Sequence, residues 1–527
     1  MSKKCVFYAS ILAAITIFLC AKVLQTKKFE IFNPVSQTKA QQVWDEKIRV
    51  DRFDFGCLMC NGIQVPVDTV EKTFYIPVNM ETEEWETMEF ASGNPEYQIV
   101  FWEDFTQYNK KDAIAGAMDI EFLVYTDTEF STYHMIFTGL PIMDISTDQG
   151  ITDQKEISGY AAFYDTNFLT QGIQTSSYYG NVRGNTSTLY PKKGYKINLT
   201  KQETDGTVVN NKLPLFGMRE DDDWLLYAIY NDDSKMRAKL SIDLWNEFGA
   251  KEVSANSTYN TNMTYIELLV DNSYYGLYGI MERIDAKQMN LQPADYMYKY
   301  KETSEFLPDK FMAATNLETY VQGFELKEGI LNEDAWIPMA EISKLYQASD
   351  EEFVEKVNDL IDEDNAIRMW LFTQLITGVD QSSKNILYVA KKELDDYRFY
   401  FAPWDMDLTW GNISAGIEPL YTVYNEELVK KAQHCQPGDR LVRLNVNGAE
   451  EKMQKLYAQM RQDSWSDEAL EERILELDDI LRNSGAYFRE QNRWPEGAYA
   501  EDCSTLIDYA KKRMKYLDTA LFDLENY

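Results

Sequence analysis

Short runs in which apolar and polar residues alternate dominate the chain from about residue 51 to residue 138. Examples are KTFYIPVNM, YQIVFW and DIEFLVYTDTEFSTYHMIFTG. Because successive side chains of a strand point to opposite faces of a sheet, this alternation predicts half-buried strands. No cluster of chemically active side chains accompanies them. The pattern therefore predicts a small β-sandwich-like accessory domain at residues 51–138, with a role in spacing or in binding.

A second β-rich segment begins near residue 139, and its pattern changes to a helical period near residue 234. Apolar residues then recur at helical spacing, and a glycine follows them: Met236, Leu240, Leu244, Phe248 and Gly249. This predicts a helix over about 234–248 that ends at the glycine. The next stretch, MTYIELLVDNSYYGLYGIMERID, predicts a β-hairpin turned at DNSYYG. Beyond about residue 350 the patterns are mainly helical.

The N-terminus carries an apolar run from Cys5 to Ala21, with Lys3 and Lys4 before it and Lys22 after it. This arrangement predicts a signal anchor or signal peptide over residues 1–30, followed by a polar linker over 31–50. No small-residue cleavage site or lipobox stands out, so an uncleaved anchor is favoured over a secreted product. The basic residues on the short side predict a cytoplasmic N-terminus, a membrane contact through residues 5–21 and an extracellular body.

Composition and charge exclude several classes of partner and of catalytic site. The chain has 527 residues, a formal net charge of -34 and no polybasic block, so nucleic acid is not an expected partner. Its two histidines, His134 and His434, stand in no hydrolase or zinc motif. The chemistry must therefore depend on carboxylates and lysines. The pair Cys57 and Cys60 is weak evidence for zinc, and a disulfide or two thiols is expected there; Cys435 and Cys503 could form a bridge.

Oxygen-rich side chains gather between residues 380 and 412, in DQSSKNILYVAKKELDDYRFYFAPWDMDLTWGN. Asp380 precedes Asn385 by five positions, and Asp405 and Asp407 follow a predicted hairpin. Strand alternation would place Asp405 and Asp407 on the same side of a strand, where they could share one ion. Hard oxygen ligands of this kind suit Mg²⁺ or Mn²⁺. The structural alternatives are a helix-end cap for Asp380 and an ordinary turn for the later aspartates.

The order of these parts resembles a protein kinase: a β-rich lobe, one helix, a hairpin, then a helical lobe with an acidic loop. The kinase HRD histidine and arginine, a full glycine-rich loop and a literal DFG are absent. More specifically, the chain over about residues 139–525 resembles the spore coat protein H (CotH) kinase family. The matching stretches are RGNTSTLYPKKGYKINL, DWLLYAIYNDDSKMRAKL, YIELLVDNSYYGLYGIMERID, GFELKEG and, most sharply, FAPWDMDLTWGN.

The resemblance implies an α+β, protein-kinase-like bilobal fold for residues 139–527, with a β-rich N-lobe and a helical C-lobe. It also implies that ATP and Mg²⁺ or Mn²⁺ are the cofactors. Asp380 would be the catalytic base and Asn385, Asp405 and Asp407 the metal ligands.

The nucleotide contacts implied by the resemblance are less sharply defined. They are Lys193 first and Lys196 second for phosphate, Arg183 from the preceding turn, and Glu282 at the adenine hinge. Strand alternation would place Lys192 and Lys196 on one face and Lys193 on the other. The nearest acids after the predicted strands, Asp233, Asp243 and Glu247, offer no clear partner for a phosphate-binding lysine.

These features together predict an exported or membrane-anchored atypical protein kinase. It would transfer the γ-phosphoryl group of ATP to Ser, Thr or Tyr hydroxyls of a surface or spore coat protein. Two other functions fit the residues. A metal-dependent glycosyltransferase also uses a D-x-D motif, and a cell-surface adhesion protein could keep the fold without catalysis.

Overall fold

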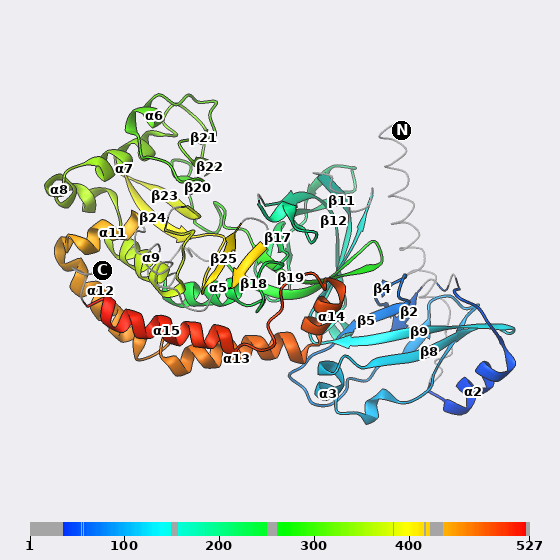
Figure 1. Cartoon of the computed structure of the whole chain (residues 1–527). Coiled ribbons are helices and arrows are strands. Elements are labelled where there is room, and N and C mark those ends of the chain that lie inside the picture. The colour runs from blue at the N-terminus through cyan, green and yellow to red at the C-terminus, as the bar shows by residue number, and fades with distance from the viewer. Residues whose placement is uncertain are drawn as a thin grey trace. The chain divides into compact units, whose positions relative to one another are not determined.

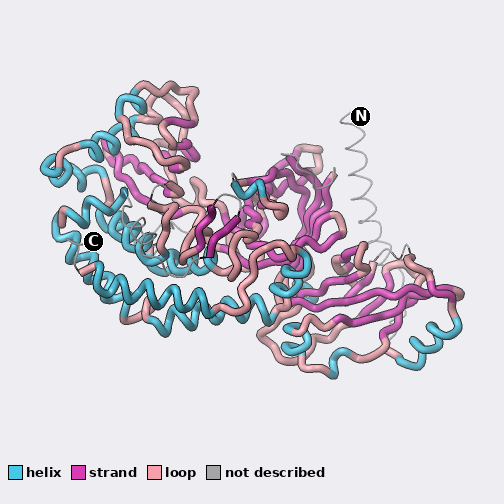
Figure 2. Tube along the Cα trace, viewed as in Figure 1, coloured by secondary structure: helices cyan, strands magenta, loops and turns pink. Residues whose placement is uncertain are grey.

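The structure of the chain is a computed structural model that describes residues 35–522, apart from residues 54, 56, 149–155, 185, 250–260, 383, 416–417 and 422–435. Helices and strands are mixed, so the protein is of the α+β class (Figures 1 and 2). The chain divides into two compact units. Unit 1 comprises residues 1–228, 264–281 and 479–496, and unit 2 comprises residues 229–263, 282–478 and 497–527.

The first part of unit 1 is the predicted accessory module. Its larger sheet has the order β4-β5-β9-β8-β7, with β1 paired to β9, and a smaller sheet has the order β3-β2-β6. The strands are β1 (Ile48–Arg49), β2 (Leu58–Cys60), β3 (Ile63–Gln64), β4 (Val67–Asp68), β5 (Thr73–Pro77), β6 (Phe90–Ser92), β7 (Gln98–Phe101), β8 (Asp119–Tyr125) and β9 (Glu129–Thr138). Both sheets contribute to one core, in which Leu58 and Phe90 join Phe74 and Phe122. Strands are present where the alternation predicts them; a separate accessory domain at residues 51–138 stays a prediction.

The segment expected to be a linker over residues 31–50 carries structure from Val35 onward. Helix α2 (Gln37–Glu46) begins at Ser36, whose hydroxyl accepts a hydrogen bond from the Lys39 amide. Its buried Ala40 and Val43 pack against the larger sheet of the module. These residues therefore belong to the accessory module and do not simply space it.

The rest of unit 1 is built on an eight-stranded sheet of order β12-β11-β10-β18-β19-β17-β13-β14. Its strands are β10 (Ile142–Thr147), β11 (Glu156–Tyr164), β12 (Gln174–Arg183), β13 (Gly194–Gln202), β14 (Val208–Asn210), β17 (Asp223–Tyr227), β18 (Met263–Val270) and β19 (Ser273–Glu282). Because β12 pairs with both β11 and β13, the strands close into a ring. Closure leaves few free edges, which stabilises a sheet of this size. The predicted hairpin is β18 and β19, turned at Asp271 and Asn272.

Two buried ion pairs within unit 1 join helix α14 (Ala486–Arg493) to this sheet. The Arg489 guanidinium donates to both carboxylate oxygens of Glu267, at 2.7 and 2.8 Å. The Lys192 ammonium lies 2.6 Å from Glu490 Oε1, and neither side chain is more than 1% exposed. Each charge is removed from water and neutralised by its partner, which is the condition under which buried ions are tolerated.

Unit 2 combines a five-stranded sheet of order β21-β22-β20-β23-β24 with most of the helices (Figures 1 and 2). Its main elements are α5 (Arg237–Phe248), β20 (Tyr296–Tyr300), β21 (Tyr320–Val321), β22 (Phe324–Glu328), α7 (Ile337–Gln347), α8 (Asp350–Leu360), α9 (Glu363–Ile376), β23 (Ile386–Glu393), β24 (Asp396–Pro403), α11 (Gln436–Arg443), α12 (Ala449–Arg461) and α15 (Ser504–Ala520). Helix α13 (Asp467–Asn483) begins in this unit and ends in unit 1. In α9 every residue from Asn365 to Ile376 is buried, so this helix is the centre of the unit.

Helix α5 begins at Arg237, three residues later than the period of its apolar residues predicts. Asp232 Oδ1 accepts hydrogen bonds from the amide and the hydroxyl of Ser234, and Lys235 has φ 63°. These local contacts hold residues 232–235 in a turn that competes with the helix. The predicted end at Phe248, with Gly249 as C-cap, is confirmed.

The predicted membrane segment lies outside the described residues. Among the helices that the structure does describe, none is both long and apolar enough to cross a membrane. No disulfide joins Cys57 to Cys60. Cys435, the proposed partner of Cys503, also lies outside the described residues.

Candidate functional site

The acidic loop of unit 2 follows directly from the buried helix α9. Thr377 has φ 50°, a left-handed conformation that ends the helix. The Lys384 amide then donates to the Asp380 carbonyl at 2.8 Å, and Asn385 Nδ2 donates to Asp380 Oδ2 at 3.1 Å. The five residues from Asp380 to Asn385 therefore form a single turn, and this turn brings the Asp380 and Asn385 side chains into contact. Lys384 Nζ also lies 3.2 Å from Asp380 Oδ2.

Hydrogen bonds join this loop to the residues that follow the hairpin β23–β24. The Trp404 amide donates to the Asn385 carbonyl at 2.9 Å. The amide nitrogen of the buried Gln381 side chain donates to the carbonyls of Trp404 and Asp405, at 2.9 and 3.1 Å. The two sequence motifs are thus parts of one structure, although the hairpin separates them along the chain.

Asp405 and Asp407 lie in a turn and not on a strand. Strand β24 ends at Pro403, and Asp405 has φ 57°. The expectation that strand alternation aligns the two carboxylates is therefore wrong, because a left-handed residue interrupts the extended backbone.

Asp407 is held by two asparagines that sequence reasoning did not single out. Asn231 Nδ2 donates to Asp407 Oδ2 at 3.1 Å. Asn412 Nδ2 donates to the carbonyls of Asp407 and Asn231, at 2.9 and 3.1 Å. Both asparagines lie in stretches already notable in the sequence, YNDDSK and TWGN. Nothing in the spacing of those stretches, however, indicates that they meet.

A buried ion pair supports the segment that carries Asn231. The Arg237 amide donates to Asp232 Oδ2 at 2.8 Å, and Arg237 Nη1 lies 2.5 Å from Asp232 Oδ1. Arg237 Nε also donates to the Trp410 carbonyl at 3.4 Å, which ties this segment to the turn after Asp407. Burial alone would raise the pKa of Asp232, but the Arg237 charge and the hydrogen bonds from Ser234 and Arg237 together hold the pKa below its usual value.

The pKa values of Asp380 and Asp407 are raised by burial and by neighbouring carboxylates. Burial and the charges of Asp405 and Asp380 together raise the pKa of Asp407 to about 8, although the hydrogen bond from Asn231 opposes the rise. Burial also raises the pKa of Asp380; the Lys384 ammonium opposes this shift and Asp405 adds to it. Carboxylates in this situation are stabilised by a proton or by a cation.

The donor set fits a divalent cation that is bound together with phosphate. The available ligands are hard oxygens, which Mg²⁺ and Mn²⁺ prefer. The buried Asn412 Oδ1 and Gln381 Oε1 have no hydrogen-bond partner among the described residues. Within the described part of the chain no three His, Cys, Asp or Glu side chains form a complete metal site. A cation that keeps waters and shares phosphate oxygens does not require such a cage.

The predicted phosphate-binding residues belong to unit 1 and are described with that unit. Lys193 Nζ donates to the carbonyls of Thr188 and Tyr190, at 2.8 and 2.6 Å. Lys196 Nζ lies 3.4 Å from Asp223 Oδ1. Arg183 is the last residue of β12. The roles of Lys193, Lys196 and Arg183 in nucleotide binding stay predictions.

Lys192, next to the predicted phosphate contacts, has a glutamate partner on a helix. Its ammonium pairs with Glu490 of α14, donates to the Leu277 carbonyl and lies 4.5 Å from the centre of the Tyr278 ring. Strand β13 starts only at Gly194. Alternation along that strand therefore says nothing about where Lys192 and Lys193 point.

Glu282 ends β19 and is 1% exposed. Its amide donates to the Asn262 carbonyl at 3.1 Å, and its carbonyl accepts from Thr261 Oγ1 at 2.6 Å. Its carboxylate accepts from Asn262 Nδ2 at 2.8 Å. Both backbone groups that could meet adenine are thus engaged within the chain, and the hinge role stays a prediction.

Comparison with known proteins gives one family. A model of the family described as CotH kinase protein matches residues 181–517, which is more than half of the 527 residues. The match includes Asp380, Asn385, Asp405 and Asp407, together with the segments that carry Asn231 and Asn412. A comparison with curated proteins found no match. On the family match, this chain belongs to the CotH kinase family.

Proposed function

We propose that the protein is an atypical kinase that transfers the γ-phosphoryl group of ATP to a Ser, Thr or Tyr hydroxyl of a protein. The observation that supports this most directly is the joining of two motifs in unit 2. Asp380 contacts Asn385, and hydrogen bonds through Trp404 and Gln381 place the Asp405 turn beside them. Kinases use an aspartate, an asparagine and a later aspartate in this order.

Asp380 would orient and deprotonate the acceptor hydroxyl. Its raised pKa suits this duty, because a general base works best when its proton affinity approaches that of the operating pH. Asn385, Asp405 and Asp407 would hold Mg²⁺ or Mn²⁺, and the cation would neutralise charge on the phosphate oxygens. Lys193, Lys196 and Arg183 would contact phosphate, and Glu282 would lie near adenine in a bilobal arrangement.

Asn231 and Asn412 would act as positioning residues for the site. Their hydrogen bonds hold Asp407 by its carboxylate and by its carbonyl. Groups that orient a ligand side chain often matter nearly as much to a metal site as the ligands themselves. Such a role gives a reason for the Asp232–Arg237 ion pair, which fixes the segment next to Asn231.

The cellular setting belongs to the same proposal. The apolar run at residues 5–21 supports export or membrane anchoring, with the body of the protein outside the cytoplasm. The acceptor would then be a protein of the cell surface or spore coat.

The test is incubation of the full chain with γ-labelled ATP, Mg²⁺ or Mn²⁺ and a general protein substrate. We expect metal-dependent label transfer that Asp405→Ala abolishes and that Asp395→Ala, an exposed change at the β23–β24 turn, leaves intact. Binding is measured in parallel with ATP and with UDP-glucose. Preference for UDP-glucose would support a glycosyltransferase instead, and absence of binding to both nucleotides would support a non-catalytic surface protein.

A further inference from the structure

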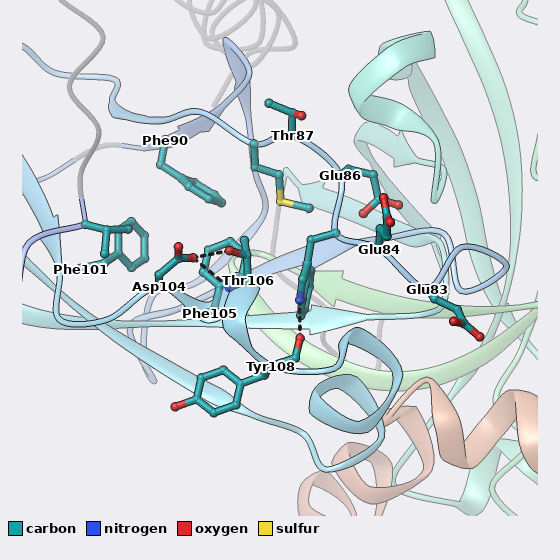
Figure 3. A pocket seen from close by; sticks show the side chains of 13 residues that line it. Glu83, Glu84, Glu86, Thr87, Phe90, Phe101, Asp104, Phe105, Thr106 and Tyr108 are labelled. Carbon is teal, nitrogen blue, oxygen red and sulfur yellow. Dashed lines mark hydrogen bonds between the residues drawn. The ribbon is translucent and has the colours of Figure 1, made fainter.

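The accessory module of unit 1 contains a pocket of about 790 Å³ (Figure 3). It lies outside the residues that match the family. The lining comes from the first described residue, the loop before β6, the ends of β6 and β7, and the segment that follows β7. These residues are Val35, Glu83, Glu84, Trp85, Glu86, Thr87, Met88, Phe90, Phe101, Asp104, Phe105, Thr106 and Tyr108. A volume of this size lies within the range of small-molecule binding pockets.

Aromatic rings form the floor and part of the rim of the pocket. Phe90, Phe101 and Phe105 are buried, and the Phe90 ring centre lies 5.4 Å from that of Phe101 and 6.1 Å from that of Phe105. Trp85 is partly exposed, and Tyr108 is 46% exposed. The floor thus offers apolar contact, while the rim offers ring faces to a ligand.

The wall of the pocket is fixed before any ligand arrives. Fully buried Lys110 donates to Glu86 Oε1 at 2.7 Å, to Thr82 Oγ1 at 3.1 Å and to the Glu84 carbonyl at 3.3 Å. Trp85 Nε1 donates to the Tyr108 carbonyl at 2.9 Å, which joins the two sides of the pocket. A preformed wall lowers the entropy cost of binding.

The charge of the lining selects the ligand. Glu83, Glu84, Glu86 and Asp104 are all acidic, and the lining contains no lysine, arginine or histidine. The buried Lys110 ammonium pairs with Glu86 Oε1. Glu86 Oε2 is also buried and has no hydrogen-bond partner among the described residues. An anionic ligand would be repelled, and a neutral sugar would leave this charge uncompensated.

We propose that this pocket binds a basic peptide segment through a lysine or arginine side chain. The charged head would meet the carboxylates of the rim, and the alkyl stem would lie on the aromatic rings. Arginine suits the pocket better than lysine, because its planar guanidinium both stacks on rings and pairs with carboxylates. This proposal does not depend on kinase activity.

The test measures binding of a fluorescent peptide of alternating arginine and glycine to the full chain by anisotropy at low salt. The variant Glu83→Gln/Glu84→Gln removes two exposed charges for which the structure gives no side-chain hydrogen bond. We expect roughly tenfold weaker binding, since exposed ion pairs contribute modestly. Tyr108→Ala leaves the charge unchanged, and we expect binding about two- to fivefold weaker through loss of the ring.

A matched control separates the pocket from the general attraction of an acidic protein for a basic peptide. The control variant, Glu96→Gln/Glu121→Gln, removes two exposed charges of the same module that do not line the pocket. It should bind as the unchanged protein does. Equal losses in the pocket and control variants would overturn the proposal. Equal binding of a glutamate–glycine peptide or of cellohexaose would also overturn it, as would unchanged binding in both pocket variants.

Discussion

Asp380 accepts a hydrogen bond from Asn385 and lies beside the Lys384 ammonium, so its carboxylate is held in one place. We predict that Asp380→Asn still binds ATP but transfers phosphate about 10² to 10⁴ times more slowly, the usual cost of losing a positioned base. Because the pKa of Asp380 is raised, transfer by the unchanged protein should rise with pH through a range above that of an ordinary aspartate.

Single-turnover label transfer and calorimetric ATP binding are the two measurements for this variant. Asp395→Asn is the control, since it makes the same chemical change at an exposed turn. Near-normal transfer by Asp380→Asn would show that the D-x-x-x-x-N spacing has another purpose, such as closing the turn after α9.

Asn231 acts through Asp407, and its substitution tests the positioning role. We predict that Asn231→Ala weakens metal-dependent ATP binding by about 10- to 100-fold, the range found when a group that orients a metal ligand is removed. ATP binding without metal should change much less. A defect in folding would instead weaken ATP binding equally with and without metal. Calorimetry with and without Mn²⁺ measures both quantities.

A second asparagine of the chain provides a matched control for Asn231→Ala. Asn210→Ala also removes an asparagine that donates to one aspartate, in this case Asp222 at 2.7 Å. If both variants lowered ATP affinity equally with and without Mn²⁺, the positioning role of Asn231 would be refuted.

At the scale of elements, helix α14 depends on charges that it buries against the sheet of unit 1. Lys192→Met removes the positive charge that neutralises the buried Glu490 carboxylate, so we predict a loss of about 3 to 5 kcal/mol in the free energy of unfolding. The double variant Lys192→Met/Glu490→Leu removes both charges and should be less destabilised than Lys192→Met. Urea unfolding followed by circular dichroism measures each change.

The comparison of single and double variants gives the coupling between the two side chains. Additive losses would mean that the charges do not stabilise each other. Lys239→Met is a suitable control, because Lys239 pairs with Asp243 within one turn of α5 in a partly exposed position. Its effect should stay within about 1 kcal/mol.

At the scale of the whole molecule, the charge pattern around residues 5–21 predicts the location of the protein. With Lys3 and Lys4 in the cytoplasm, everything after the apolar run would lie outside. Protease added to intact producing cells should therefore digest the body of the chain, and a cytoplasmic protein should survive as the control. Full protection of the chain, with digestion only after lysis, would contradict this topology.

Local patterns in the sequence were sufficient for most elements. The hairpins β18–β19 and β23–β24, the strands of the accessory module and the end of α5 follow from periods of two and 3.6 residues and from turn residues. The motif D-x-x-x-x-N is also local, because five residues after α9 suffice to bring Asn385 to Asp380. Such features need no knowledge of distant residues.

Tertiary structure decided which distant side chains meet. Glu490 reaches Lys192 across 298 positions, and Asn231 reaches Asp407 across 176. Neither pair has a spacing that a period can reveal, because packing of whole elements brings them together. The pocket of the accessory module has the same origin, since the Trp85 indole reaches the Tyr108 carbonyl only once their loops are folded. Sequence alone therefore determined the elements, the family and the acidic motifs, whereas the fold determined their partners.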